Sequence, residues 1–144
     1  MKTDLQGLTG ASFGVPVEYG KIREFAEAIQ SPVAVYREGD TVIAPATFLT
    51  TTFFWERRVP GADLIEALAL NPASAVHATQ EYRFFGPPPG AGTVLSAQMR
   101  VDKVGSKTNR QGKVLKIAEL GTEFRAAGRL VAESRMTIIE PEAA

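Results

Sequence analysis

The pattern of apolar and polar positions singles out residues 44–57, which read Ala-Pro-Ala-Thr-Phe-Leu-Thr-Thr-Thr-Phe-Phe-Trp-Glu-Arg. Large apolar side chains repeat there at spacings of three and four residues, which predicts a helix. The remaining positions are mostly threonines, so the segment lacks the charged face of a surface helix. We therefore expect one long central helix that is buried over most of its circumference.

The second half of the chain has the alternation that is typical of strands. Residues 76–85 alternate, and so do residues 93–104, 113–124 and 129–139. The last three segments are joined by Gly-containing polar loops, so they predict three antiparallel strands in a meander.

The first half contributes smaller elements. Residues 14–19 resemble a short strand, which would lie at a sheet edge because Pro16 has no backbone N–H. Residues 21–29 have one apolar and one charged face and predict a helix. Residues 1–12 lack periodicity and are expected to form a loose leader, which leaves a single domain over residues 13–144. A buried helix followed by a sheet long enough to curl around it predicts an α+β fold.

Composition excludes several classes of protein. The 144 residues include sixteen basic and sixteen acidic side chains, so no net field favours nucleic acid or an anionic membrane as a partner. The absence of cysteine excludes thiol catalysis, and a single histidine, His77, excludes a His-rich metal site within one chain. No apolar stretch approaches the length of a membrane span. These features predict a cytoplasmic domain without a metal or bound cofactor.

Four segments in order resemble the MaoC-like dehydratases, and most closely their N-terminal-half type, the non-catalytic partner subunit of mycobacterial (3R)-hydroxyacyl-ACP dehydratases. The likeness covers residues 15–141. It implies a hot-dog fold, in which a curved antiparallel sheet wraps a long helix, acting on fatty-acyl thioesters of CoA or acyl carrier protein. The segments are Val-Glu-Tyr-Gly-Lys-Ile-Arg-Glu-Phe-Ala at 17–26, Ile-Ala-Pro-Ala-Thr-Phe at 43–48, Val-His-Ala-Thr-Gln-Glu-Tyr-Arg-Phe at 76–84, and the Pro-rich connection at 87–93.

The catalytic loop of the resembled family is absent. That chemistry needs the aspartate and histidine of a Gly-Asp-x-Asn-Pro-x-His loop after the first helix, because water and the proton next to the thioester must be handled together. Residues 29–36 stand in its place. Pro32 matches the proline, but Ala34 falls where the histidine would be, and neither Gln30 nor Ser31 replaces the aspartate.

The resemblance therefore implies an accessory subunit of an (R)-specific enoyl-thioester hydratase or 3-hydroxyacyl-thioester dehydratase. Such a chain would itself lack catalysis and would pair with a MaoC-like subunit carrying the Asp/His loop, as a heterodimer or heterotetramer, or with a second copy of itself. The carrier (CoA or acyl carrier protein), the acyl length and the choice between fatty and sterol substrates remain open.

Two residues are weak candidates for acid–base work. His77 would act as general base beside Glu81, which is expected on the same strand face two pleats further along. A histidine without an orienting partner in the sequence is more often a polar residue at a strand entrance that bonds to a nearby carbonyl. We favour this second interpretation.

The start of the central helix is a further candidate site. Free backbone N–H groups near Ala46 and Thr47 would polarise a thioester oxygen. The aromatic side chains Phe48, Phe53 and Trp55 would line an acyl tunnel, although aromatic residues on a buried helix are more often core. These five residues form the predicted substrate-binding set.

A basic cluster surrounds the loop between the second and third long strands. It would meet the phosphates of CoA or the acidic face of a carrier protein, but hairpin loops are commonly charged simply because they are solvated, and this interpretation is favoured. The cluster comprises Lys103, Lys107, Arg110, Lys113 and Lys116.

Two other functions fit the same fold. The first is a homodimeric acyl-CoA-binding module without catalysis. The second is a thioesterase in which a carboxylate near the central helix, Asp40 or Glu56, would activate water. Asp40 lies in a Glu-Gly-Asp turn, where an aspartate is expected for local reasons.

Overall fold

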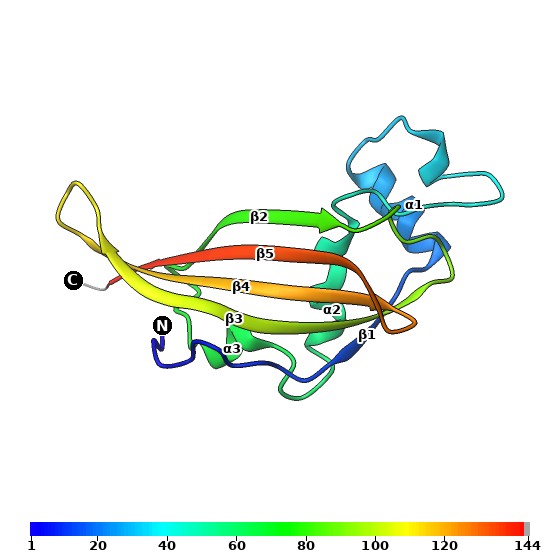
Figure 1. Cartoon of the computed structure of the whole chain (residues 1–144). Coiled ribbons are helices and arrows are strands. Elements are labelled where there is room, and N and C mark those ends of the chain that lie inside the picture. Colours follow the sequence, from blue (N-terminus) through cyan, green and yellow to red (C-terminus); the bar gives the residue numbers. More distant parts are fainter. Residues whose placement is uncertain (143–144) are drawn as a thin grey trace.

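The computed structural model describes residues 1–142 and contains one five-stranded antiparallel sheet with the strand order β1-β3-β4-β5-β2 (Figure 1). Short helical segments precede the four long strands. The elements are β1 (Phe13–Pro16), α1 (Tyr19–Ala28), η1 (Ala34–Tyr36), η2 (Phe48–Thr52), α2 (Phe53–Glu56), α3 (Leu64–Ala67), β2 (Val76–Phe84), β3 (Val94–Thr108), β4 (Val114–Ala126) and β5 (Arg129–Pro141).

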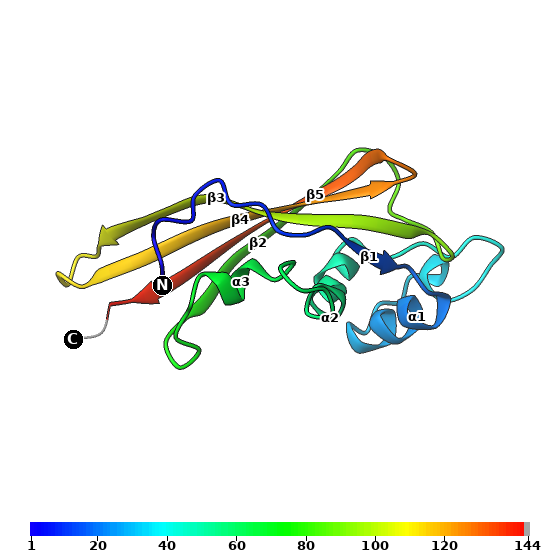
Figure 2. The same cartoon turned by 90° about the horizontal axis from the view of Figure 1, so that it is seen from below.

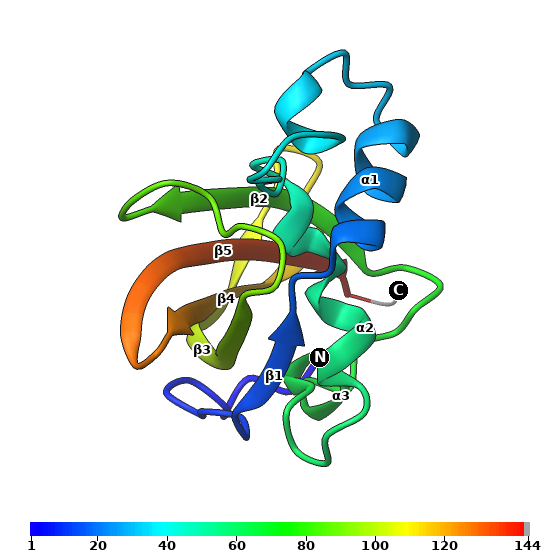
Figure 3. The same cartoon turned by 90° about the vertical axis from the view of Figure 1, so that its right-hand side faces the viewer.

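The predicted α+β hot-dog architecture is confirmed. All the helices lie on one side of the sheet, and the sheet curves around them (Figures 2 and 3). The meander of β3, β4 and β5 is also confirmed. The strand predicted over residues 93–104 is β3, and it is longer than expected. Its pairing with β4 continues to Thr108, which lies opposite Val114. Its polar end reads as a loop in the sequence although its backbone is paired.

The central helix differs from the prediction of one long buried helix over residues 44–57. The helix begins at Phe48 as the 3-10 segment η2 and becomes α-helical only at Phe53. The hydroxyl groups of Thr51 and Thr52 donate to the carbonyl oxygens of Phe48 and Leu49, three residues earlier, a spacing that suits a 3-10 turn.

Burial along this helix also differs from the prediction. Phe48 is 2% exposed, whereas Phe53 is 38% and Phe54 is 58% exposed. The change from three to 3.6 residues per turn at Phe53 shifts which side chains face the sheet. The exposed side of α2 is therefore an apolar face that this chain does not cover.

Two apolar clusters fill the space between the sheet and the helices. The first joins Val15 and Ile22 to Phe48, and the rings of Phe25 and Phe48 meet edge to face at 5.6 Å. The second packs Leu64 and Leu68 of the α3 region onto the sheet, with Met99, Val101, Ala118, Leu120 and Ile138. The α1 helix and the α3 segment are thus each fixed to one half of the sheet.

The two edges of the sheet are treated differently. On one edge β1 pairs with the start of β3, and residues 7–10 continue along the same strand. Gly7 donates to the Val101 carbonyl, and Gly10 donates to the Met99 carbonyl. The predicted loose leader therefore packs on its own domain, and Pro16 lies in an edge strand as expected. The other edge is β2, most of whose residues are exposed.

No helix within residues 1–142 is long and apolar enough to cross a membrane.

Candidate functional site

The segment that replaces the Asp/His loop leads from α1 into η1. Ser31 Oγ accepts a weak hydrogen bond from the Val33 N–H at 3.4 Å, and Ala34 begins the 3-10 turn. Residues 29–36 contain no carboxylate and no imidazole. This loop therefore lacks the aspartate–histidine pair on which the resembled chemistry depends.

The weak acid–base candidates lie on opposite faces of the sheet. His77 pairs with Ile138 and Glu81 with Arg135, and a bulge between His77 and Thr79 shifts the register. Residues 135 and 138 of β5 are an odd number of positions apart, so they point to opposite faces. The expectation that His77 and Glu81 share a strand face is wrong. The imidazole Nε2 instead contacts the Thr79 carbonyl oxygen at 3.0 Å.

The predicted substrate-binding set is spread over different environments. Ala46 and Thr47 are exposed, and no side chain caps the start of η2. Phe48 is core, Phe53 is exposed, and Trp55 is half-buried beneath the Arg58 guanidinium, whose carbon lies 4.7 Å from the ring centroid.

A first hollow, which we call the helix groove, separates α1 from η2 and α2. Its volume is about 450 Å³. It brings together two residues of the predicted set, Phe48 and Trp55, with Phe54 as a further aromatic wall. The other lining residues are Pro16, Lys21, Glu24, Phe25, Ala28, Thr51 and Arg58.

A second hollow, which we call the α3 hollow, lies between the α3 region and the strands β2 and β5. It is larger, at about 690 Å³, and His77 is on its wall. None of the five predicted substrate-binding residues lines the α3 hollow. Its walls come from segments that follow the predicted set in the sequence. They include Arg57, Val59, Asp63, Ile65, Leu70, Ala75, Val76, Met136 and Ile138.

A pair of hydroxyl groups connects the central helix to the edge strand. Thr50 Oγ1 and the Tyr82 phenol oxygen are 2.6 Å apart. Burial raises the pKa of the Tyr82 phenol, and the hydrogen bond with Thr50 acts in the opposite direction. The contact fixes η2 relative to β2, and no periodicity in the sequence points to it.

One carboxyl group is buried away from both hollows. Glu56, at the end of α2, is 3% exposed, and it lines neither the helix groove nor the α3 hollow. Burial, followed by the nearby Asp63 carboxylate, raises the pKa of Glu56 to about 7, while Arg57 acts in the opposite direction. The other carboxylate considered for water activation, Asp40, is exposed in the loop before η2.

Comparison with protein-family models identifies the family of the chain. A family model described as "FAS1-like, dehydratase domain region" matches residues 6–134. No match was found among curated proteins.

Several solved structures share the fold of this chain. The C-terminally truncated HadBC (3R)-hydroxyacyl-ACP dehydratase complex from Mycobacterium tuberculosis is similar with a TM-score of 0.70 and 22% identity, over 96% of this chain and 99% of that chain. A MaoC-like dehydratase has a TM-score of 0.76 and 19% identity, over 97% of this chain and 43% of that chain. An (R)-hydratase from A. caviae involved in PHA biosynthesis has a TM-score of 0.67 and 14% identity, over 96% and 98%.

These similarities agree with the element order and sheet topology described above, and the resemblance to MaoC-like dehydratases is confirmed. Because the family model matches nearly the whole chain, the protein belongs to the FAS1-like dehydratase-region family.

Proposed function

We propose that the chain is an accessory subunit of a hydratase or dehydratase that adds or removes water at the 2,3 position of an acyl thioester. The observation that carries this proposal is the absence of a proton-transfer pair. The bulge in β2 separates His77 from Glu81, and residues 29–36 contain neither a carboxylate nor an imidazole. Acid–base catalysis requires both groups within hydrogen-bond reach of the substrate, so they must come from another chain.

The partner of this proposal is a second hot-dog chain that pairs along the β2 edge. The opposite edge is already occupied by β1 and by residues 7–10, whereas β2 exposes backbone groups that a further strand could satisfy. The exposed rings of Phe53 and Phe54 add an apolar face on the helix side of the sheet. The HadBC relative is itself a complex of two different chains, which supports this arrangement.

The α3 hollow is the better of the two candidate acyl sites. Ala75, Val76 and His77 of its wall belong to the β2 end of the sheet, so a chain added at that edge would help to enclose it. The helix groove is walled instead by Pro16 and α1, away from this edge. We therefore assign the acyl chain to the α3 hollow, with Phe48 and Trp55 of the helix groove as the competing site.

The catalytic proposal is tested by following the hydration of crotonyl-CoA through loss of the enone absorbance. The chain alone should show no turnover, and a MaoC-like subunit that carries the Asp/His loop should give activity that depends on both chains. Robust turnover by the chain alone would refute the accessory role. Tight binding of acyl-CoA, with no activity in any such complex, would instead identify a binding module.

The choice of hollow is tested with two matched cavity-filling variants. Ile65→Trp fills the α3 hollow, and Ala28→Trp adds the same ring to the helix groove. In the active complex, Ile65→Trp should lower activity toward long acyl chains much more than toward crotonyl-CoA, whereas Ala28→Trp should change neither. The opposite result would assign the acyl chain to the helix groove.

A further inference from the structure

The hairpin formed by the end of β3 and the start of β4 carries positive charge alone. Residues 103–118 contain no Asp or Glu, and we call their five Lys and Arg residues the basic hairpin: Lys103, Lys107, Arg110, Lys113 and Lys116. Because basic and acidic residues are equal in number over the whole chain, the rest of the molecule has a net negative charge. Charge is therefore distributed unevenly over the molecule, with an excess of positive charge at this hairpin.

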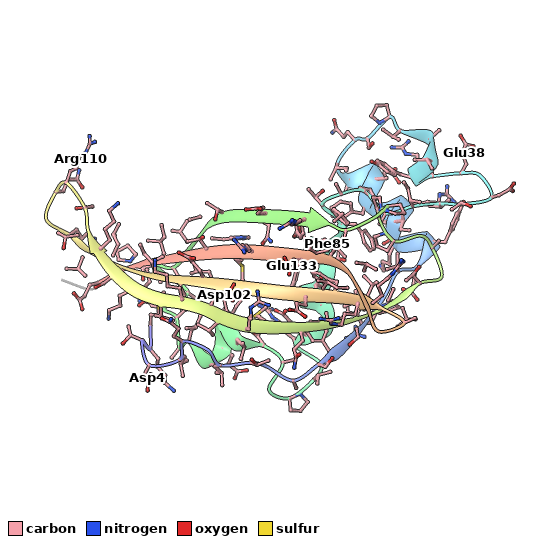
Figure 4. The ribbon with its side chains drawn as sticks, in the orientation of Figure 1. Asp4, Glu38, Phe85, Asp102, Arg110 and Glu133 are labelled. Carbon is pink, nitrogen blue, oxygen red and sulfur yellow. The ribbon has the colours of Figure 1, made fainter. Side chains whose placement is uncertain are left out.

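Only the base of the basic hairpin is neutralised by the body of the protein. Lys103 lies 4.0 Å from Glu119 and Lys116 lies 3.5 Å from Glu142. The other three cations, at the tip, are exposed and form no ion pair with any residue in 1–142. Figure 4 shows Arg110 at the far end of the hairpin, pointing away from the sheet. These three charges are available to a partner.

The backbone that carries these charges is ordered by hydrogen bonds. The ladder continues to the Thr108–Val114 pair. Beyond it, the Asn109 side-chain oxygen accepts hydrogen bonds from the backbone N–H groups of Gln111 and Lys113, both at 2.9 Å. The Asn109 N–H also donates to the Lys113 carbonyl. A partner would thus meet an ordered surface, which reduces the entropy lost on binding.

The basic hairpin extends from the same end of the sheet as the α3 hollow. Strand pairing connects His77 to Ile138, Ile138 to Ala118, and Ala118 to Val104. His77 and Ile138 line the α3 hollow, and Val104, at the other end of this row of paired residues, follows Lys103 of the basic hairpin. A molecule bound to the hairpin would therefore sit beside the hollow.

We propose that the basic hairpin docks the acidic surface of an acyl carrier protein, which presents its acyl group to the α3 hollow. This inference rests on the proposed accessory role. The five charges extend over roughly 20 Å of ladder, so one phosphate group cannot contact them together, whereas an extended acidic protein surface can. Residues 103–118 contain no aromatic side chain on which the bases of a single-stranded nucleic acid would stack.

The test uses the catalytically active complex with two substrates, crotonyl-CoA and crotonyl-loaded acyl carrier protein. The test variant reverses the three cations at the tip: Lys107→Glu, Arg110→Glu and Lys113→Glu. The control variant changes the net charge equally by reversing three exposed arginines outside the hairpin: Arg23→Glu, Arg37→Glu and Arg129→Glu.

At low salt we expect the tip variant to lose about tenfold or more in kcat/KM for the carrier-protein substrate, since charge complementarity mainly accelerates association. Its kcat/KM for crotonyl-CoA should stay within about twofold of that of the unmodified complex. The loss in kcat/KM for the carrier-protein substrate should shrink as added salt screens the charges. The control variant should leave both substrates unaffected.

Three results would overturn the docking role: equal losses with both substrates, equal losses in the tip and control variants, or a carrier-protein rate that the tip variant does not change. Each of them leaves the accessory role intact so long as the complex hydrates crotonyl-CoA. A complex without crotonyl-CoA hydratase activity would refute the accessory role itself. Docking would still be supported without that activity if this chain alone bound crotonyl-loaded carrier protein and the tip variant did not.

Discussion

Replacing Glu56 by glutamine should stabilise the protein above neutral pH. The carboxyl group is 3% exposed and faces the added negative charge of Asp63, so its ionised form is disfavoured in the folded state. Glutamine keeps nearly the same shape without the charge. The variant therefore isolates the cost of holding a carboxylate at this position.

The magnitude follows from the pKa of Glu56, which rises from its ordinary value of 4.5 to about 7 in the folded protein. At about 1.4 kcal/mol per pKa unit, the folded state loses up to about 3 kcal/mol relative to the unfolded state. A raised carboxyl pKa means that the unfolded chain loses its proton first. The destabilisation caused by Glu56 is therefore absent below pH 4.5, grows as the pH rises toward 7, and then stays constant.

The assay is urea unfolding at a series of pH values between 4.5 and 8. Glu56→Gln should match the unmodified protein at the acidic end and exceed its unfolding free energy by up to about 3 kcal/mol at pH 8. Glu27→Gln, which neutralises an exposed carboxylate on α1, should change stability by no more than about 0.5 kcal/mol. Parallel pH profiles for Glu56→Gln and the unmodified protein would refute the reasoning.

Two further variants test how the sheet and its N-terminal segment are held together. Glu140 accepts hydrogen bonds from the Met1 α-amino group and the Asn71 N–H, both at 2.8 Å, and these bonds lower its pKa. Glu140→Gln should lower the free energy of unfolding by about 1–3 kcal/mol at pH 7. The difference from the unmodified protein should shrink as acid protonates Glu140, and an equal loss at pH 7 and pH 3 would contradict this. Phe124 is a core side chain of the first apolar cluster and is 1% exposed. Phe124→Ala should lower the free energy of unfolding in urea by about 3–5 kcal/mol, and a loss below about 1 kcal/mol would show that this cluster does not stabilise the sheet.

Local patterns in the sequence were sufficient for most of the fold. Alternation predicted β3 and β5 because one face of each strand packs on the helices while the other is more exposed. It also predicted β2, although most residues of that strand are exposed. The α1 helix was predicted from its apolar face, where Ile22 and Ala26 are buried. The missing Asp/His pair could also be read directly, because it depends on residue identity alone.

Features that depend on pairing between distant segments were not predictable. The bulge near His77 is set by the pairing of β2 with β5, so simple alternation along β2 placed His77 and Glu81 on one face. The α3 hollow combines residues from both halves of the chain, including Ile65 and Met136. The long-helix prediction was wrong because the threonine-rich segment winds as a 3-10 turn up to Thr52.

The central claim is that this chain contributes no proton-transfer group to the reaction. The most direct test is the double variant His77→Ala and Glu81→Gln, measured in the active complex by the kcat for crotonyl-CoA hydration over a range of pH. The account predicts an unchanged kcat and an unchanged pH profile, because all acid–base groups belong to the partner. A loss of about 100-fold or more, the effect of removing a general acid or base, would contradict it and would make this chain part of the catalytic machinery.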